Sequence, residues 1–507
     1  MAVAERGPIL ALAGIAVLAV ALRIPFIWAG VGPDEGGYAF VGHEWAHGVG
    51  IYSQVWVDRP QGLLLLFRAI TDVAYAPWAI RLAAALLGGA LAVVVGTIGW
   101  MLRGRATGLL AAAIFAIVGI APNLEGFTLN AELAAALPAA AAVACAIRWH
   151  AVGRRRWLVA AGVFGATAVL MKQSGFDGLA IALLVALVAR APRTERAKRV
   201  GAVVAGAAVP LGAAAIHGAV IGWKKYWFAI YGLRAQDTLT SGVGDRLHRL
   251  GQVMPKLTED ILGLGLIALL GAALLARRRG RLWLLAPAWL AVALVGVNLG
   301  GLYWPHYFVQ LIAPLVLLAA VAVATLSPRM PVLAVAAACI AVAPVAITLV
   351  HLATTSASTR TAEVRYLAGY EKERRLARFV RDHSVPTDTI YVVGSRADLY
   401  FLADRRPPIP FLWSHSGLKT AQAKDAVLRA LGERGGPKLV IAWRQPSDVD
   451  KSGSLSQVLS RRYRFLWRPT TTGPKPLPAV LIARDARPGP GVPYTTRHPI
   501  AIDPGGD

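Results

Sequence analysis

Residues 331–350 read PVLAVAAACIAVAPVAITLV, twenty consecutive positions without a charged side chain. A helix of about 20 apolar residues crosses the hydrocarbon core of a bilayer, and it satisfies its own backbone hydrogen bonds there. Comparable apolar stretches recur upstream, at 8–29, 77–102, 106–122, 131–149, 157–172, 174–190, 199–221, 260–276, 282–301 and 304–326. The sequence therefore predicts a mainly α-helical, polytopic membrane bundle of about 11 transmembrane helices.

The composition of the whole chain agrees with this fold class. Of its 507 residues, 56% are hydrophobic and 16% are charged, and the mean hydropathy is +0.53. Soluble domains carry about 25% charged residues. A net charge of +25 would indicate nucleic-acid binding in a soluble protein. Because the basic runs here lie between apolar stretches, we expect membrane lipids, and no nucleic acid, as partners.

The basic runs also predict how the chain crosses the membrane, since Lys and Arg gather in cytoplasmic loops. Four such runs lie at 103–105, 154–156, 190–199 and 277–281. All four are cytoplasmic if the N-terminus is cytoplasmic and the short apolar segment at 62–75 lies in the interface instead of crossing it. This topology predicts a multi-pass plasma-membrane protein whose active site and C-terminal region are extracytoplasmic.

The first polar candidate follows the first apolar stretch directly. Residues 32–38 read GPDEGGY, in which Asp34 and Glu35 are adjacent. Two carboxylates at a membrane surface are costly unless they are paired, solvated or bound to a cation. Asp34 is suited to act as a general base toward a hydroxyl, and the pair could hold a divalent cation. The structural alternative is that Asp34 caps an interfacial helix near 35–48.

Two cationic candidates lie at later helix boundaries. Arg59, which follows Asp58, has the guanidinium geometry that suits a phosphate, although it could instead pair with its neighbour. Lys172 precedes Gln173 between two apolar stretches. A helix that begins at Ser174 would direct free backbone donors to the same side as Lys172, which favours an anion. The alternative is a lysine that snorkels to the interface.

An acid and an aromatic stretch complete the set. Glu132 lies in the first turn expected for the helix at 131–149, where it could contact a hydroxyl or a metal, or simply favour the helix N-terminus. Residues 303–308 read YWPHYF, so His306 and Tyr307 could contact a ligand, whereas aromatic residues alone are typical of the membrane interface. Acids and cations on one face are what transfer from a phosphate leaving group requires.

These motifs resemble the GT-C superfamily of membrane glycosyltransferases, and most of all family 39, which includes protein O-mannosyltransferases and is related to the lipid A aminoarabinose transferase. The resemblance covers residues 1–350. It rests on Asp34-Glu35-Gly36-Gly37-Tyr38, Arg59-Pro60, Lys172-Gln173 and Trp304-Pro305-His306-Tyr307. One departure is Gln61, which stands where the family motif has a second proline.

The resemblance implies an inverting transfer of a sugar from a polyprenyl-phosphate donor to a hydroxyl of a glycan, lipid or protein acceptor. It implies that Asp34, alone or with Glu35, is the base. The implied contacts of the donor phosphate are Arg59, Lys172, His306 and Tyr307. Further candidates are Tyr38, Asp58, Glu132 and Gln173. No cofactor other than the divalent cation is indicated.

A physical argument points to the same donor class. Nucleotide sugars are cytoplasmic and too highly charged to cross a membrane unaided, so a transferase that works outside needs a donor delivered within the bilayer. The alternative function is a secondary transporter, or a flippase of lipid-linked sugars, that uses the outer acidic residues for ion coupling.

The C-terminal region has a different pattern, of short strands that alternate with helices. Strands are expected at 389–393, 438–443, 463–467 and 479–483, and helices at 370–383, 396–402, 420–431 and 454–460. This predicts a small extracytoplasmic α/β domain at 353–485, after a catalytic membrane module at 1–352. Residues 486–507 are rich in Pro and Gly, which is typical of a disordered tail.

Overall fold

The computed structural model describes residues 3–235, 242–277, 284–356, 364, 370–467 and 478–487. The chain divides into two compact units. Unit 1 comprises Met1–Ala29, Asp58–Leu66 and Ala76–Leu367, and unit 2 comprises Gly30–Val57, Phe67–Tyr75 and Ala368–Asp507. The predicted tail at 486–507 lies almost entirely outside the described residues. The predicted domain limits at 352 and 485 stay a prediction.

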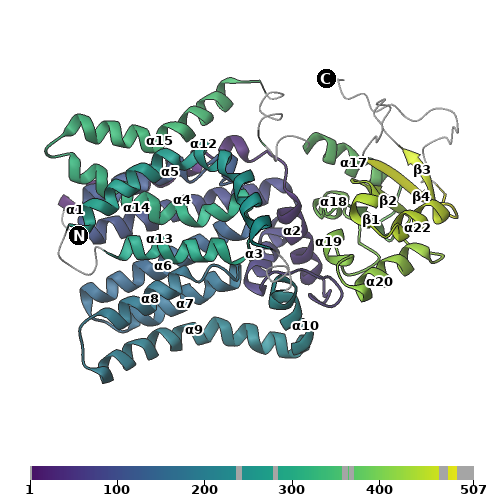
Figure 1. Ribbon diagram of the computed structural model, residues 1–507, viewed down its shortest axis with the longest axis horizontal. Helices are drawn as coiled ribbons and strands as arrows, with labels where there is room; N and C mark the ends of the chain where they lie inside the picture. Colours follow the sequence, from purple (N-terminus) through teal and green to yellow (C-terminus); the bar gives the residue numbers. More distant parts are fainter. Residues whose placement is uncertain are drawn as a thin grey trace. The chain divides into compact units, whose positions relative to one another are not determined.

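Unit 1 is a bundle of apolar helices (Figure 1). Seven described helices are long and apolar enough to cross a membrane. They are α1 (Val3–Ala21), α4 (Pro77–Arg103), α6 (Ala131–Val152), α9 (Arg193–Ile221), α12 (Val243–Ala276), α14 (Val309–Leu326) and α15 (Pro331–Thr354). Four shorter apolar helices are α5 (Arg105–Val118), α7 (Arg156–Met171), α8 (Asp177–Val188) and α13 (Leu285–Leu299). Each predicted apolar stretch coincides with one of these helices, which confirms the polytopic helical bundle.

Small residues let neighbouring helices of unit 1 approach closely. A Cβ atom on Gly162 of α7 would lie 2.0 Å from the Val203 carbonyl oxygen of α9, and a Cβ atom on Gly206 would lie 2.0 Å from the Val159 carbonyl oxygen. Helices in membranes associate through such contacts because lipid provides no hydrophobic driving force between them. The two helices therefore pack side by side along their length (Figure 1).

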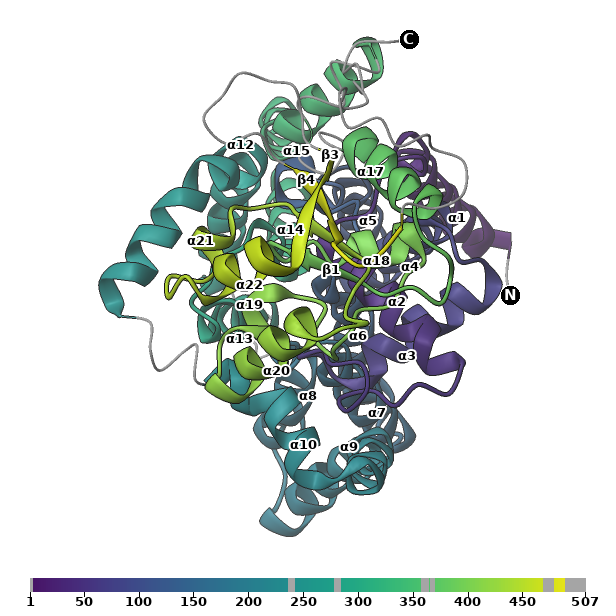
Figure 2. The same cartoon turned by 90° about the vertical axis from the view of Figure 1, so that its right-hand side faces the viewer.

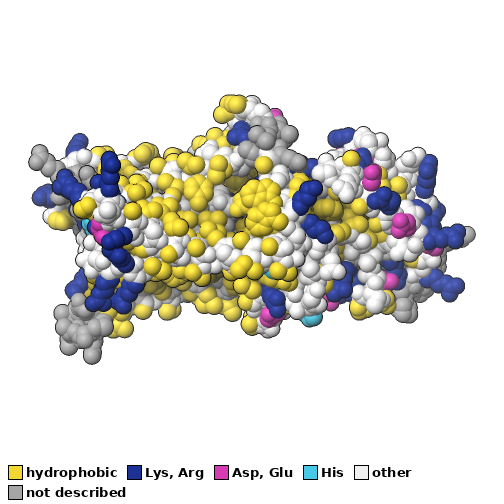
Figure 3. All heavy atoms as spheres, turned by 90° about the horizontal axis from the view of Figure 1, so that it is seen from below, with side chains coloured by type: hydrophobic (Ala, Val, Ile, Leu, Met, Phe, Trp, Pro, Cys, Tyr) yellow, Lys and Arg dark blue, Asp and Glu magenta, His cyan; other side chains and the backbone are white. Residues whose placement is uncertain are grey.

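Basic side chains gather at one end of the apolar bundle (Figure 3). α4 ends at Arg103, α7 begins at Arg156 and α9 begins at Arg193. Between the last two helices, Arg155 forms an ion pair of 2.9 Å with Glu195. Their common location agrees with the loops that the charge pattern predicts to be cytoplasmic.

The described residues between the predicted apolar stretches at 199–221 and 260–276, namely 222–235 and 242–259, are largely helical. They include α10 (Trp223–Trp227), a π-helical turn η3 (Phe228–Gly232) and the first part of α12. α12 therefore begins at Val243, well before the predicted residue 260. This part of α12 could not be predicted as an apolar stretch because it contains polar residues such as Asp245 and Lys256.

Unit 2 contains a four-stranded sheet in the order β1-β2-β4-β3, and strands β1, β3 and β4 are labelled in Figure 2. Its strands are β1 (Ile390–Val393), β2 (Leu439–Ala442), β3 (Tyr463–Trp467) and β4 (Ala479–Ala483). β1 and β2 are parallel, and β4 is antiparallel to β2 and β3. The accompanying helices include α17 (Tyr370–Asp382), α18 (Asp398–Ala403), α20 (Ala421–Gly432) and α22 (Ser454–Arg462). The predicted α/β domain, with its strands and helices, is confirmed.

The helix that carries the acidic motif packs within unit 2. A Cβ atom on Gly36 of α2 (Pro33–Ala46) would lie 2.6 Å from Asp398 Cα in α18, and one on Gly37 would lie 2.5 Å from the Trp413 ring. Because the two glycines have no side chains, α18 and Trp413 can pack directly against α2. The second helix predicted to lie in the membrane interface, α3 (Gln61–Val73), begins in unit 1 and ends in unit 2. Both predicted interfacial segments are helical.

One arginine of unit 2 is shared by two buried carboxylates. Arg396 Nη2 lies 2.5 Å from Glu373 Oε1 and 2.5 Å from Asp398 Oδ2. Glu373 is 3% exposed and Asp398 is fully buried. Burial raises the pKa of Glu373 to about 7, although Arg396 opposes this shift. One positive charge cannot fully compensate two carboxylates away from water, so Glu373 retains a proton at mildly acidic pH.

This group should make the stability of the chain depend on pH. In the unfolded chain Glu373 titrates near 4.5. Its favourable contribution to the free energy of unfolding is therefore complete below pH 4.5 and is lost as the pH rises through 7. The loss is about 3 kcal/mol. Glu373→Gln mimics the protonated group, so the variant should gain stability over the wild type between pH 5 and pH 8. Thermal unfolding of the full chain in detergent measures this, with the exposed Asp425→Asn as control. The prediction is wrong if the difference in unfolding midpoint between wild type and Glu373→Gln stays the same from pH 5 to pH 8.

Candidate functional site

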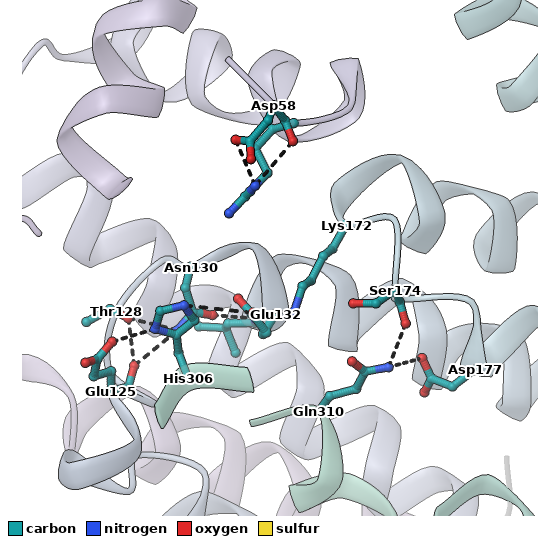
Figure 4. A network of polar contacts seen from close by, with 12 residues as sticks. Asp58, Glu125, Thr128, Asn130, Glu132, Lys172, Ser174, Asp177, His306 and Gln310 are labelled. Carbon is teal, nitrogen blue, oxygen red and sulfur yellow. Dashed lines mark hydrogen bonds and ion pairs between the residues drawn. The ribbon is translucent and has the colours of Figure 1, made fainter. Parts of the chain in front are cut away.

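A buried network of charged side chains lies at one end of the helices of unit 1 (Figure 4). Lys172 directly follows α7, Glu132 lies in the first turn of α6, and His306 belongs to the short 3-10 helix η5 (Pro305–Phe308). The Lys172 ammonium forms an ion pair with Glu132 Oε1. All three residues are at most 8% exposed. A charged pair buried in this way needs good geometry and further hydrogen bonds to offset its desolvation.

His306 and Tyr307 supply these further contacts. His306 Nδ1 lies 2.7 Å from Glu125 Oε2, and its Nε2 lies 4.0 Å from Glu132 Oε1. The imidazole therefore lies between two carboxylates. The Lys172 Nζ atom also lies 3.9 Å from the centroid of the Tyr307 ring, a cation–π contact. An anion that approaches Lys172 would compete with Glu132 for the same ammonium group.

The loop that carries Glu125 is held by an acid from another helix. Asp260 of α12, which is fully buried, accepts hydrogen bonds from the Asn123 and Leu124 amides at 2.9 and 3.3 Å. Within this loop Ala121 and Glu125 have φ angles of 21° and 61°, which are uncommon for residues other than glycine. Asp260 thus stabilises a strained loop that directs Glu125 toward His306. Asp260 is not among the predicted site residues, although an acid at the start of an apolar stretch is a signal of function.

A second set of hydrogen bonds holds the loop that follows Lys172. Gln310 of α14 donates hydrogen bonds to the Ser174 carbonyl at 3.1 Å and to Asp177 Oδ1 at 2.9 Å. The Trp289 indole donates to Asp177 Oδ2 at 2.6 Å. The buried carboxylate of Asp177 therefore joins three helices beneath the lysine (Figure 4). Asp177 is likewise not among the predicted site residues.

The second predicted cation, Arg59, adjoins the same loop. Its Nη1 lies 2.9 Å from Asp58 Oδ1, and Arg234 Nε lies 2.5 Å from Asp58 Oδ2. The Gln173 amide donates to the Asp58 carbonyl at 3.1 Å and to the Ile230 carbonyl at 2.8 Å. The predicted alternative, in which Arg59 pairs with Asp58, is thus present. Gln173 links this pair to the lysine loop.

The acidic motif itself begins α2 in unit 2. Gly32 is the N-cap of this helix, so the alternative in which Asp34 caps it is wrong. The cap contact comes from Glu35, which is 2% exposed and whose Oε2 accepts a hydrogen bond from the Gly32 amide at 3.0 Å. Tyr38 is buried, with its ring 5.9 Å from Trp413. Because Glu35 has this structural role, Asp34 is the stronger candidate base.

The predicted site residues therefore fall into two groups. In unit 1 the structure brings together Glu132, Lys172, His306 and Tyr307, with Asp58, Arg59 and Gln173 beside them. Asp34, Glu35 and Tyr38 belong to unit 2, so their convergence with the first group stays a prediction. Within the described residues no three His, Cys, Asp or Glu side chains are placed to hold one metal ion. The cation predicted at Asp34 and Glu35 has no third ligand there.

No protein-family model and no curated protein matches the sequence, but several solved structures match the fold. ArnT from Cupriavidus metallidurans, bound to undecaprenyl phosphate, has a TM-score of 0.68 at 17% identity, and the match covers 94% of this chain and 98% of that one. The Archaeoglobus fulgidus oligosaccharyltransferase in its apo form has a TM-score of 0.55 at 14% identity, with 92% and 74% covered.

A third similar structure is the arabinofuranosyltransferase AftD from Mycobacteria. Its TM-score is 0.53 at 16% identity, and the match covers 94% of this chain but only 42% of AftD. This chain thus spans less than half of that much longer protein. The shared architecture extends over nearly the whole of the present chain in all three cases. The chain is a multi-pass membrane protein with the GT-C fold, as the resemblance of its acidic and basic motifs implied.

Proposed function

We propose that this chain is a membrane glycosyltransferase that moves a hexosyl or pentosyl group from a polyprenyl-phosphate donor to an acceptor hydroxyl. The observation that carries the proposal is the buried Lys172, held between Glu132 and Tyr307 at the end of an apolar bundle with this fold. An ionisable group buried among apolar helices points to a functional site, and a phosphate that reaches Lys172 would compete with Glu132 for its ammonium group. The phosphate of a lipid-linked sugar is an anion that can reach the end of this bundle while its lipid stays in the membrane.

The solved structures support this donor class. ArnT was solved with undecaprenyl phosphate, and the Archaeoglobus oligosaccharyltransferase was also solved with an inhibitory peptide and a dolichol-phosphate. Both lipids are polyprenyl-type phosphates. The basic ends of α4, α7 and α9 support a cytoplasmic location for that side of the bundle, and hence an extracytoplasmic site at the other.

The proposed reaction is a single displacement with inversion. The acceptor oxygen forms a bond to the anomeric carbon while the bond from that carbon to the phosphate oxygen breaks, and its electron pair stays on the departing polyprenyl phosphate. Asp34 takes the proton of the acceptor hydroxyl. Lys172 and Arg59 stabilise the negative charge of the phosphate as it leaves, and His306 and Tyr307 position Lys172.

A divalent cation at Asp34 and Glu35 would be an addition to this scheme. The Archaeoglobus oligosaccharyltransferase was solved as a complex with Zn and sulfate, which supports metal use in this fold. In the present chain Glu35 is engaged with the Gly32 amide. The proposed reaction therefore relies on protein side chains alone.

Purified chain in vesicles, supplied with a panel of polyprenyl-phosphate hexoses and pentoses, tests the proposal. We expect one donor to give a glycosylated glycan, lipid or peptide together with one equivalent of free polyprenyl phosphate, and the product to have the opposite anomeric configuration. Vesicles without protein are the control. The transporter or flippase alternative predicts movement of a lipid-linked sugar across the vesicle membrane without product, and this result would overturn the proposal.

A further inference from the structure

Residues 43–47 read His-Glu-Trp-Ala-His and form the end of α2 in unit 2. Two histidines four positions apart share one face of a helix, and this spacing on a helix is the pattern through which paired imidazoles bind zinc. Neither residue belongs to the proposed donor site. Because so short a motif also occurs by chance, whether it binds a metal must be judged from the geometry of the surrounding side chains.

The two rings are already close together. Their centroids lie 4.3 Å apart at an interplanar angle of 52°. Zinc–nitrogen bonds of about 2.0–2.1 Å in a tetrahedral site place two coordinating nitrogens about 3.4 Å apart, a spacing that rings at this separation can reach by small rotations. The His43 ring also packs against Tyr75, with centroids 4.1 Å apart. This contact limits the orientations of His43.

The hydrogen bonds leave coordinating nitrogens available on both histidines. His47 Nδ1 lies 2.8 Å from the His43 carbonyl oxygen, so Nδ1 donates its proton and Nε2 carries the lone pair. Metal-bound histidines usually donate their second nitrogen in this way. Within the described part of the chain, the His43 ring forms no hydrogen bond.

Carboxylates supply the negative charge beside this pair. Asp404 and Asp72 both act electrostatically on His43, as does the positive charge of Arg406. Asp404 follows α18, is exposed and has a φ angle of 51°. Glu44, the second residue of the motif, lies 2.7 Å from Arg406 Nε. That ion pair occupies the carboxylate that acts as a general base when this motif serves in peptidases.

We propose that His43 and His47 bind a divalent transition-metal ion, zinc in particular, with Asp404 as a third ligand and water as the fourth. Two imidazoles and one carboxylate form a ligand set that zinc prefers. In the described residues no three such groups already surround one point, so the Asp404 side chain turns toward the imidazoles when the ion binds. The ion then joins the end of α2 to the end of α18.

The role that follows is structural. α2 carries Asp34 at its start, and a metal at its other end would fix this helix against α18 within the same unit. Because Glu44 is paired with Arg406, the site has no base beside the ion for hydrolysis. The proposal does not depend on the transferase function, and binding can be measured without any sugar donor.

The test is titration of the full, chelator-treated chain in detergent with Co²⁺ followed by displacement with Zn²⁺. We expect one Co²⁺ per chain with the visible absorption of a tetrahedral site, and a higher thermal unfolding midpoint with zinc. His43→Gln and His47→Gln should each weaken binding by more than about tenfold, and Asp404→Asn should weaken it less. The exposed His150→Gln is the matched control, with binding as in the wild type.

Two results would overturn the proposal. One is the absence of stoichiometric Co²⁺ and Zn²⁺ binding by the wild-type chain. The other is unchanged binding by the double variant His43→Gln/His47→Gln, which would place the ion elsewhere, and His306→Gln then tests the unit 1 network. His47 is exposed at the helix end, so His47→Gln should fold, and its unfolding midpoint in chelator verifies this.

Discussion

Replacing Asp34 by Asn is expected to lower the rate of sugar transfer by about 10²–10⁴-fold while the chain still folds. An amide has the shape of the carboxylate but cannot accept the proton of the acceptor hydroxyl. Asp34 is only partly buried, and the helix start is capped by Glu35, so folding should not require the charge. The measurement is the turnover number at saturating donor, with the unfolding midpoint of each variant.

Two companion variants separate chemistry from structure. Asp382→Asn makes the same chemical change at an exposed position of unit 2 and should leave turnover unaltered. Glu35→Gln should lower the unfolding midpoint, because a neutral oxygen is a weaker acceptor for the Gly32 amide. An Asp34→Asn chain with wild-type turnover would remove Asp34 from the role of base.

The second large effect concerns Lys172. Lys172→Met leaves the Glu132 carboxylate buried without its ammonium partner, so we expect a loss of stability of about 3–5 kcal/mol. The double variant Lys172→Met/Glu132→Gln removes both charges and should regain most of this stability. Neither variant should bind the polyprenyl-phosphate donor with wild-type affinity, because the cation for the phosphate is absent from both.

Thermal unfolding and the dissociation constant for a polyprenyl phosphate separate these two expectations. Arg155→Met is the matched control, because it also removes one partner of an ion pair in unit 1. The Arg155–Glu195 side chains are 53% and 34% exposed, so its loss should cost less than about 1 kcal/mol. Wild-type donor affinity in the double variant would show that Lys172 only compensates Glu132.

The fold could be predicted from the sequence because its signals are local. Twenty uncharged and almost wholly apolar residues in a row, as at 331–350, specify a membrane helix whatever surrounds them. The C-terminal strands were found at 389–393 and 438–443 for the same reason, since short apolar runs between turn residues indicate buried strands. α2 is different: only its glycine contacts with Asp398 and Trp413 reveal that it packs within unit 2.

The candidate site was predictable only in its residue types. The sequence indicates that Lys172 needs an anionic partner, but not that this partner is Glu132 rather than Glu125. The His306–Glu125 contact joins residues 181 positions apart, and no local pattern records such a pairing. Asp260 could not be predicted because it holds a loop through backbone N–H groups, which every residue except proline possesses.

The glycines of the acidic motif have a consequence for any attempt to shorten the chain. Because Gly36 and Gly37 have no side chains, Asp398 and Trp413 from the C-terminal region pack directly against one face of the helix that carries Asp34. A truncated chain that ends after α15 would retain Lys172 and all the described helices that are long enough to span a membrane, yet expose that face of α2. The C-terminal region is thus part of the packing around the helix that carries the proposed base, and a chain without it should lose the order of that helix.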